Sequence, residues 1–277
     1  MKSALAVVIL GGAATVAAQE LKPIYPLAVT AAKDGTIYLA DRNLPGVWKM
    51  VDGKPVLYFQ ASKKFRTPLN AVRCLAIDND GKLLAGDSST REIYRFDDAG
   101  QPQPLTKGGV GIPMALAVDA RGDIWAADIE IHRIVKIPSA GGEAAIIAEV
   151  PAPRGLAFDG EGRLWVVSQG KDQIVRLSAD GKTSEVIVSG QPFSFPHQIA
   201  FDAAGTAYVT DGYSKAVWKV APPAAPVKLV GGSPLDNPVG IARNGEKLLV
   251  IDPRANSLFE VATDGKLTTM TLGPPIK

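Results

Sequence analysis

Short apolar segments recur along this chain at a nearly constant spacing. The clearest unit is an apolar-Ala-apolar-Asp phrase, which ends at Asp78, Asp119, Asp159 and Asp202. Successive copies therefore lie 40 to 43 residues apart, and weaker copies occur at 27–30 and 241–244. A period of this length is typical of repeat architectures, in which every copy adopts the same local fold. The pattern predicts six copies of one structural unit.

Each copy contains the same order of apolar and polar segments. A glycine-bearing turn such as Asp80-Gly81 precedes a short apolar segment such as 83–87, and a polar loop then leads to an alternating segment such as 92–96. A second turn, for example Asp180-Gly181, precedes a last and more polar segment. Short alternating segments separated by turns are typical of antiparallel strands, and no stretch has a helical period. We expect four antiparallel strands per copy.

One four-stranded sheet of this size cannot cover both of its own faces. Radial stacking of six sheets buries those faces and leaves short edges. Each buried Leu, Ile, Val or Phe then contributes roughly 1.5–3 kcal/mol. The sequence therefore predicts an all-β fold, a six-bladed β-propeller of four-stranded antiparallel blades, as one domain over residues 19–277. Both ends contain complete repeats, so we expect the ring to close by packing of sheet faces.

The repeats resemble the NHL repeat. The resemblance rests on Pro153–Asp159, Gly162–Val166, Ile174–Leu177, Pro196–Asp202 and Tyr208–Asp211. It covers the whole predicted mature chain and implies a six-bladed propeller of the SMP-30/gluconolactonase-like superfamily. Such propellers include binding scaffolds, lyases and hydrolases, so the resemblance implies a fold without choosing among these activities.

The first eighteen residues are predicted to be a cleavable signal peptide. Lys2 supplies a positive start, residues 4–14 are apolar, and small residues at 16–18 suit cleavage. No later segment reaches the roughly 18 apolar residues that a membrane span requires. The formal net charge of +2 argues against nucleic acid as a partner. We expect a secreted or periplasmic monomer without a disulfide, since Cys74 is the only cysteine.

Two rings of side chains are expected at one mouth of the central channel. The first ring, at the start of the innermost strands, contains Tyr25, Arg73, Met114, Arg154, His197 and Val239. The second ring, at the end of the second strands, contains Asp41, Asp87, Asp128, Ser168, Asp211 and Asp252. An Asp repeated in this way most simply accepts backbone hydrogen bonds, as in an Asx turn. The first ring varies between repeats, and function is expected there.

Positive charge gathers in the first ring. Two guanidinium groups about 8 Å apart repel each other by roughly 2 kcal/mol at an effective dielectric constant of 20. Pairing with a rim aspartate or binding of an anionic ligand would offset this repulsion, and arginine suits carboxylate and phosphate groups. We predict that a small anionic or polar molecule, or a protein segment, binds to Arg73, Arg154, Met114 and Asp87.

Catalysis is the alternative interpretation of the same ring. His197 is the candidate general acid or base, Asp211 would orient it, and Tyr25 would assist. With Arg73 and Arg154 these residues could support hydrolysis of a lactone, or elimination, as the resemblance to streptogramin-lyase-like propellers implies. A third interpretation is a non-catalytic scaffold whose outer loops bind a protein. The sequence leaves open whether the protein is an enzyme.

The resemblance to gluconolactonases also implies positions for a channel cation. These positions correspond approximately to Tyr25, Arg73, His197 and Asp211, and only the aspartate matches the family pattern. Two histidines are too few for a three-histidine zinc site. We therefore predict no metal ligands and no cofactor, because a divalent cation fits these side chains poorly.

Overall fold

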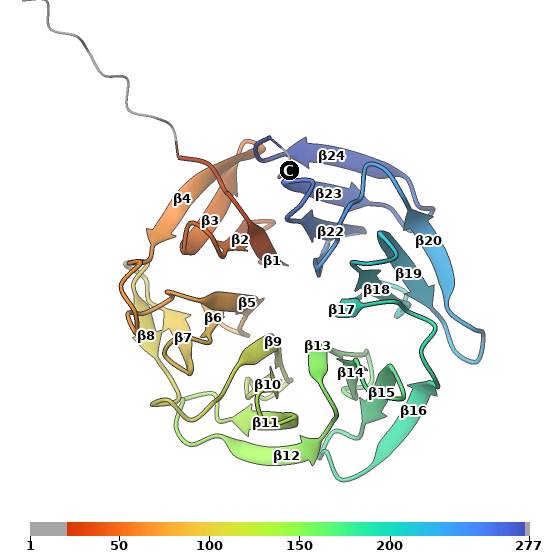
Figure 1. The fold of residues 1–277 in the computed structure, drawn as a ribbon. Helices are drawn as coiled ribbons and strands as arrows, with labels where there is room; N and C mark the ends of the chain where they lie inside the picture. Colours follow the sequence, from red (N-terminus) through yellow and green to blue (C-terminus); the bar gives the residue numbers. More distant parts are fainter. Residues whose placement is uncertain (1–20, 275–277) are drawn as a thin grey trace, which may run out of the picture.

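The computed structural model describes residues 21–274, which form six four-stranded antiparallel sheets around a central channel (Figure 1). Blades one to three contain β1 (Pro26–Ala31), β2 (Ile37–Asp41), β3 (Gly46–Val51), β4 (Lys54–Gln60), β5 (Val72–Ile77), β6 (Leu83–Asp87), β7 (Glu92–Phe96), β8 (Pro102–Pro104), β9 (Pro113–Val118), β10 (Ile124–Asp128), β11 (Arg133–Ile137) and β12 (Ala145–Glu149). Blades four to six contain β13 (Pro153–Phe158), β14 (Leu164–Ser168), β15 (Ile174–Leu177), β16 (Ser184–Val188), β17 (Pro196–Phe201), β18 (Ala207–Asp211), β19 (Ala216–Val220), β20 (Val227–Gly231), β21 (Gly240–Asn244), β22 (Lys247–Asp252), β23 (Ser257–Val261) and β24 (Leu267–Thr271). The predicted all-β, six-bladed propeller is confirmed. The signal peptide predicted at 1–18 lies outside the described residues.

The first strand of each blade borders the channel, and the fourth lies at the periphery. Figure 1 shows β1, β5, β9, β13 and β17 nearest the centre, with β4, β8, β12 and β16 outside. Each inner strand contacts the inner strand of the next blade, and β21 contacts β1, so the ring is closed. Residues 21–274 contain no helix that could cross a membrane.

The apolar faces of adjacent blades form the core. Six clusters of buried side chains fill the six spaces between blades. The last of these joins the first and sixth blades, where Trp48 of β3 packs with Leu249 and Leu258. Face packing therefore closes the ring, as the complete terminal repeats indicated.

The repeated Asp of the sequence phrase ties the first hairpin of a blade together. Asp119 accepts backbone hydrogen bonds from Arg121 and Asp123 and a 3.0 Å bond from the indole N–H of Trp125. Asp159 and Asp202 accept the equivalent bonds, including those from Trp165 Nε1 and the Tyr208 hydroxyl. This recurring aspartate therefore has a structural role in the turn.

Candidate functional site

A β-bulge near the start of the inner strand sends one extra side chain to the channel mouth. In blade two, Val72 pairs with Asp87 and Cys74 pairs with Gly86, so Arg73 has no partner in the sheet. Met114 and Arg154 occupy the same place in β9 and β13, and β17 has a bulge that contains His197. Bulges commonly redirect a side chain next to a functional site. The positions that differ between repeats are therefore also those that the backbone turns toward the channel.

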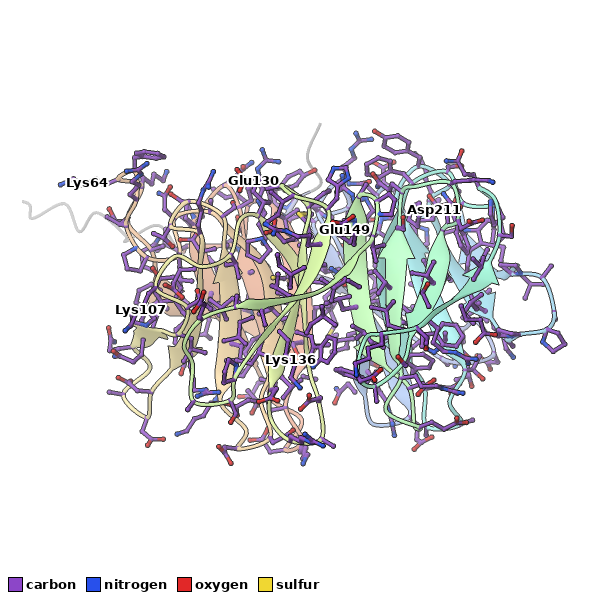
Figure 2. The ribbon with its side chains drawn as sticks, turned by 90° about the horizontal axis from the view of Figure 1, so that it is seen from below. Lys64, Lys107, Glu130, Lys136, Glu149 and Asp211 are labelled. Atoms are coloured by element: carbon purple, nitrogen blue, oxygen red, sulfur yellow. The ribbon has the colours of Figure 1, made fainter. Side chains whose placement is uncertain are left out.

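A cavity of about 180 Å³ lies at this mouth of the channel. It is lined by Tyr25, Leu27, Arg42, Arg73, Met114, Arg154, His197, Gln198, Asn237 and Val239. Five predicted site residues therefore meet in one cavity, although more than 170 positions separate Tyr25 from His197 along the chain. The other two, Asp87 and Asp211, do not line it. Figure 2 shows Asp211 near the same face of the disc as Glu130 and Lys64, and Lys136 toward the opposite face.

The position assigned to Tyr25 in the repeat alignment needs a correction. Pro26 pairs with Asp41 and Ala28 pairs with Ala40, so the bulged residue equivalent to Arg73 is Leu27. Tyr25 precedes the strand, and its backbone N–H donates to both carboxylate oxygens of Asp41 at 3.1 Å. The alignment was two positions early because the terminal repeat is weak, yet Tyr25 reaches the same cavity.

Three guanidinium groups line the cavity, and its lining contains no carboxylate. The Nε atom of Arg73 donates a 3.1 Å hydrogen bond to Ser88 Oγ. The guanidinium of Arg154 lies over the ring of Phe195, 4.9 Å from its centroid, and its Nε is buried without a hydrogen-bond partner. Within the described chain, neither of these arginines nor Arg42 forms an ion pair. The alternative of pairing with a rim aspartate is therefore not realised.

Burial and mutual repulsion lower the pKa of both inner arginines. For Arg73 the larger cause is burial, followed by the charge of Arg42, while Asp87 opposes the shift. For Arg154 burial again comes first, followed by the charge of Arg73. Both groups remain cationic at neutral pH because an arginine pKa lies far above 7. The cavity thus contains positive charge that its own side chains leave largely uncompensated.

The buried aspartates of the second ring hold loops in place. Asp87 accepts hydrogen bonds from the backbone N–H groups of Ala71 and Ser89, at 2.9 and 3.0 Å, and from the Thr90 hydroxyl. Asp211 accepts equivalent bonds from Ser194, Phe195 and Ser214. Asp41, Asp128 and Asp252 follow the same pattern. This arrangement is the structural role that the repeated Asp indicated, and it fixes the loop that enters each inner strand.

His197 is held in its neutral form. Burial, and then the charge of Arg154, lower the pKa of its imidazole to about 4, while Asp211 opposes the shift. The Phe195 ring contacts the imidazole edge-on, with centroids 5.0 Å apart. Within residues 21–274, no hydrogen bond joins His197 to Asp211, so the aspartate acts on the imidazole through its charge. At neutral pH the imidazole carries an unprotonated nitrogen.

Besides Leu27, three polar residues of the cavity escaped the sequence analysis. Arg42 directly follows the second-ring residue Asp41, so a ring drawn one position further along would have identified it. Asn237 lies in the loop before β21, where no repeat pattern exists. Gln198 donates from Nε2 to the backbone oxygens of Met114 and Arg154, at 2.8 and 3.1 Å, and so links three blades across the channel.

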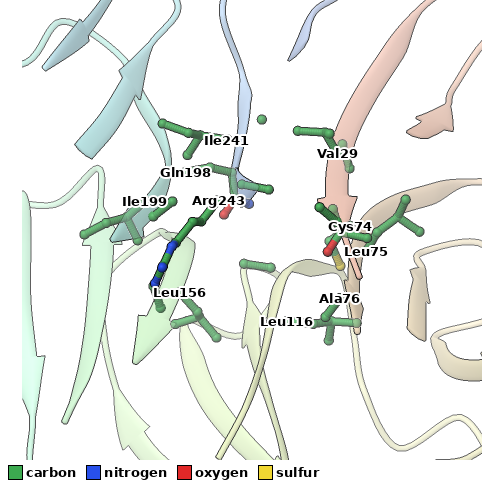
Figure 3. A pocket seen from close by; sticks show the side chains of 18 of the residues that line it. Val29, Cys74, Leu75, Ala76, Leu116, Leu156, Gln198, Ile199, Ile241 and Arg243 are labelled. Carbon is green, nitrogen blue, oxygen red and sulfur yellow. The ribbon is translucent and has the colours of Figure 1, made fainter. Parts of the chain in front are cut away.

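Gln198 also borders a second cavity further along the channel. This cavity of about 390 Å³ is lined mainly by the inner strands, including Leu116, Leu156, Ile199 and Ile241 (Figure 3). Its one charged residue besides Arg73 is Arg243, whose Nε donates a 2.8 Å hydrogen bond to the Gly245 oxygen. Leu27, Arg73 and Gln198 line both cavities, so these residues lie between the cationic mouth and the channel below it.

The side chains at the mouth do not fit a divalent cation. The described residues contain no group of three His, Cys, Asp or Glu side chains that could hold a metal. Of the four positions that gluconolactonases imply, Arg73 is cationic and the Asp211 carboxylate is engaged by backbone N–H groups. Hard cations require several free oxygen ligands, so no catalytic step is assigned to a metal here.

Comparison with known proteins identifies the family of this fold. A family model described as "Virginiamycin B lyase family" matches residues 58–275. The search of curated proteins found no significant match. Virginiamycin B lyase from Staphylococcus aureus is 18% identical over 94% of this chain and 89% of that chain, with a TM-score of 0.69.

Two other structural neighbours represent the groups that the sequence resemblance named. A gluconolactonase from Xanthomonas campestris is 17% identical over 84% of each chain, with a TM-score of 0.71. A chain of a nidogen/laminin complex is 20% identical over 89% of this chain and 93% of that one, with a TM-score of 0.70. The resemblance to NHL-type and gluconolactonase-like propellers is therefore confirmed, and at these identities it shows the fold alone.

Proposed function

The chain belongs to the virginiamycin B lyase family, and from that premise we propose that the mouth of its channel binds a small anionic molecule. The observation that carries the proposal is the convergence of Arg42, Arg73 and Arg154 on one cavity whose lining has no carboxylate. A bound carboxylate or phosphate would accept bidentate hydrogen bonds from these groups. It would also relieve the repulsion that lowers the pKa of Arg73 and Arg154.

The cavity also supplies neutral groups that could orient such a ligand. The Tyr25 hydroxyl and the Asn237 amide can donate hydrogen bonds, and both residues line the cavity. Within residues 21–274 the buried Nε of Arg154 is a donor without a partner, and an unsatisfied buried donor is costly. A ligand oxygen at that atom would satisfy it. The volume of about 180 Å³ favours a small molecule or one end of a larger one.

Isothermal titration and thermal unfolding with phosphate and with acetate test this proposal. We expect saturable binding and a rise in Tm for the wild-type protein, because the ligand binds the folded state. Arg73→Gln should weaken binding at least about tenfold, as loss of a charge-assisted contact costs roughly 1.5–3 kcal/mol. Arg121→Gln, at an exposed arginine outside the mouth cavity, is the matched control and should leave binding unchanged. Equal affinities for Arg73→Gln and wild type would contradict the proposal.

A lyase is the second candidate function, favoured by the family match and by the neutral imidazole of His197 at the same cavity. In an elimination, the unprotonated nitrogen of His197 would take a proton from the carbon next to a carbonyl group. The electrons of that C–H bond would form a C=C bond, and the leaving oxygen would depart with the electrons of its C–O bond. Arg73 and Arg154 would stabilise the negative charge that develops on oxygen. Tyr25, which lines the same cavity, would protonate the departing group.

Quinupristin provides a direct test of this second candidate, because one structural neighbour is a catalytically inactive variant of the Staphylococcus aureus lyase with quinupristin. Quinupristin is cyclic, and its ring can be opened by hydrolysis or by elimination. Mass spectrometry distinguishes these two reactions, since hydrolysis adds one water to the molecule and elimination leaves its mass unchanged. We expect elimination that His197→Asn abolishes. Turnover that survives this substitution would remove the histidine from the reaction.

Export from the cytoplasm is proposed from the first eighteen residues. Sequencing the amino terminus of the protein recovered from the medium or the periplasm tests it. We expect the chain to begin at residue 19, and recovery of intact Met1 in the cytoplasm alone would contradict this.

A further inference from the structure

A stacked pair of aromatic rings, one half-buried and one exposed, lies beside the arginine cavity, and we propose that it is a subsite for an aryl group of the anionic ligand. This inference rests on the proposed anion binding and narrows its ligand to small aryl carboxylates. The pair consists of Phe195, just before β17, and Tyr213, just after β18. The rings stack with centroids 4.5 Å apart and an angle of 20° between their planes.

The Tyr213 ring is open to solvent. Its residue is 67% exposed, whereas Trp48 and Trp125 in the blades are 1% exposed. Among the large hydrophobic residues of the described chain, the other exposed aromatic one is Phe65. Stacking on Phe195 covers one face of Tyr213, so its remaining surface can receive a second planar group. Aromatic rings favour offset-stacked or edge-to-face partners, which a planar ligand can supply.

The pair is continuous with the wall of the cavity. The ring of Phe195 contacts the guanidinium of Arg154 at 4.9 Å and the imidazole of His197 at 5.0 Å, and both of those residues line the cavity. The phenol of Tyr213 is near enough to Arg154 to raise the pKa of its guanidinium, against the larger effect of burial. A ligand whose carboxylate binds the arginines can therefore extend a ring along Phe195 toward Tyr213.

The loops fix the pair in this place. Asp211 anchors the loop before β17 and the loop after β18, because its carboxylate accepts hydrogen bonds from the backbone N–H groups of Phe195 and Ser214. Gly212 lies so close to this cavity that a Cβ atom there would overlap the side-chain oxygen of Asn237 and crowd the ring of His197. The backbone next to Tyr213 is therefore packed onto the cavity. A stacking surface formed in advance loses little conformational entropy on binding.

Matched pairs of carboxylates test the subsite by isothermal titration. Phenylacetate and 3-phenylpropanoate are compared with cyclohexylacetate and 3-cyclohexylpropanoate, which have saturated rings of similar size. We expect each aryl compound to bind about 3- to 10-fold more tightly than its saturated partner, the range that an aromatic contact gives. Tyr213→Ala should remove this preference, and Tyr213→Phe should retain it. Phe65→Ala, at the other exposed aromatic ring, should have no effect.

The outcomes separate this inference from the proposed function. Equal affinities for aryl and saturated compounds, unchanged by Tyr213→Ala, would overturn the aryl subsite and leave anion binding intact. If phosphate, acetate and all four carboxylates fail to bind, the proposed function itself is wrong and the subsite falls with it. Loss of the aryl preference in Tyr213→Ala would support the aryl subsite. Weaker binding of both aryl and saturated compounds by Arg73→Gln would support anion binding at the arginines.

Discussion

A Cβ atom on Gly212 would lie 3.1 Å from the Nε2 atom of His197. The same Cβ would clash with the side-chain oxygen of Asn237, which lines the cavity together with His197. The loop that follows β18 is therefore packed directly onto two side chains of the proposed binding site. A side chain at residue 212 would therefore crowd both the Asn237 amide and the imidazole.

Substitution of Gly212 tests this packing. We expect Gly212→Ala to displace Asn237 and His197, to lower the free energy of unfolding by roughly 1–3 kcal/mol, and to weaken anion binding. Chemical denaturation and isothermal titration measure the two effects. Gly160→Ala is the matched control, since a Cβ there meets no atom within 4 Å. An unchanged affinity in Gly212→Ala would show that the packing does not shape the cavity.

The lowered pKa of His197 predicts a dependence of stability on pH. The folded-state pKa of about 4 lies below the ordinary value of 6.5, so between these values the unfolded chain binds more protons. Stability should therefore fall as the pH decreases from about 6.5 to 4, by up to about 3 kcal/mol. Because carboxylates also titrate near the lower limit, the measured quantity is the difference between wild type and His197→Asn. His132→Asn, at an exposed histidine, provides the comparison, and identical pH profiles for wild type and His197→Asn would contradict the assignment.

Substitution of an aspartate in the second ring is expected to lower the stability of the fold. Asp87→Asn leaves an uncharged oxygen for the backbone N–H groups of Ala71 and Ser89 and replaces the oxygen that accepts from the Thr90 hydroxyl by an amide donor. We expect a loss of about 2 kcal/mol in unfolding free energy, because buried donors lose a charged partner. Asp98→Asn, whose side chain is 95% exposed, should cost little. A stable Asp87→Asn protein that no longer binds anions would instead place Asp87 in the ligand contact.

Substitution of Gln198 is expected to open a path between the two cavities. Gln198→Ala removes the hydrogen bonds to the Met114 and Arg154 oxygens and shortens a side chain that lines both cavities. We expect a cost of about 1 kcal/mol in stability. We also expect a higher affinity for carboxylates with long alkyl chains, which could enter the channel below. Denaturation and titration with octanoate measure these changes, and an unchanged octanoate affinity would show that the amide does not close the channel.

The repeat allowed the fold to be predicted because it is a property of the whole sequence. Four-stranded units that recur about every 42 residues must bury two apolar faces each, and six of them close a ring. The same repeat predicted that Arg73, Arg154 and His197 share one mouth, since equivalent positions in a propeller lie on one circle.

The features that the sequence analysis missed depend on departures from the repeat. Tyr25 was misaligned because the first repeat is weak, and the structure places Leu27 at the equivalent position. Asn237 and the aromatic pair lie in loops, whose conformations no periodic pattern determines. The alternative in which the arginines pair with rim aspartates is not realised because backbone N–H groups already engage those carboxylates. Hydrogen bonds of that kind depend on loop geometry.

A crystal structure with 4-bromobenzoate tests whether the mouth of the channel holds an aryl carboxylate, because the anomalous signal of bromine locates the ligand without ambiguity. We predict the carboxylate between the guanidinium groups of Arg73 and Arg154 and the bromine toward Phe195 and Tyr213. Bromine sites elsewhere, with the arginine cavity filled by water alone at saturating ligand, would contradict this prediction.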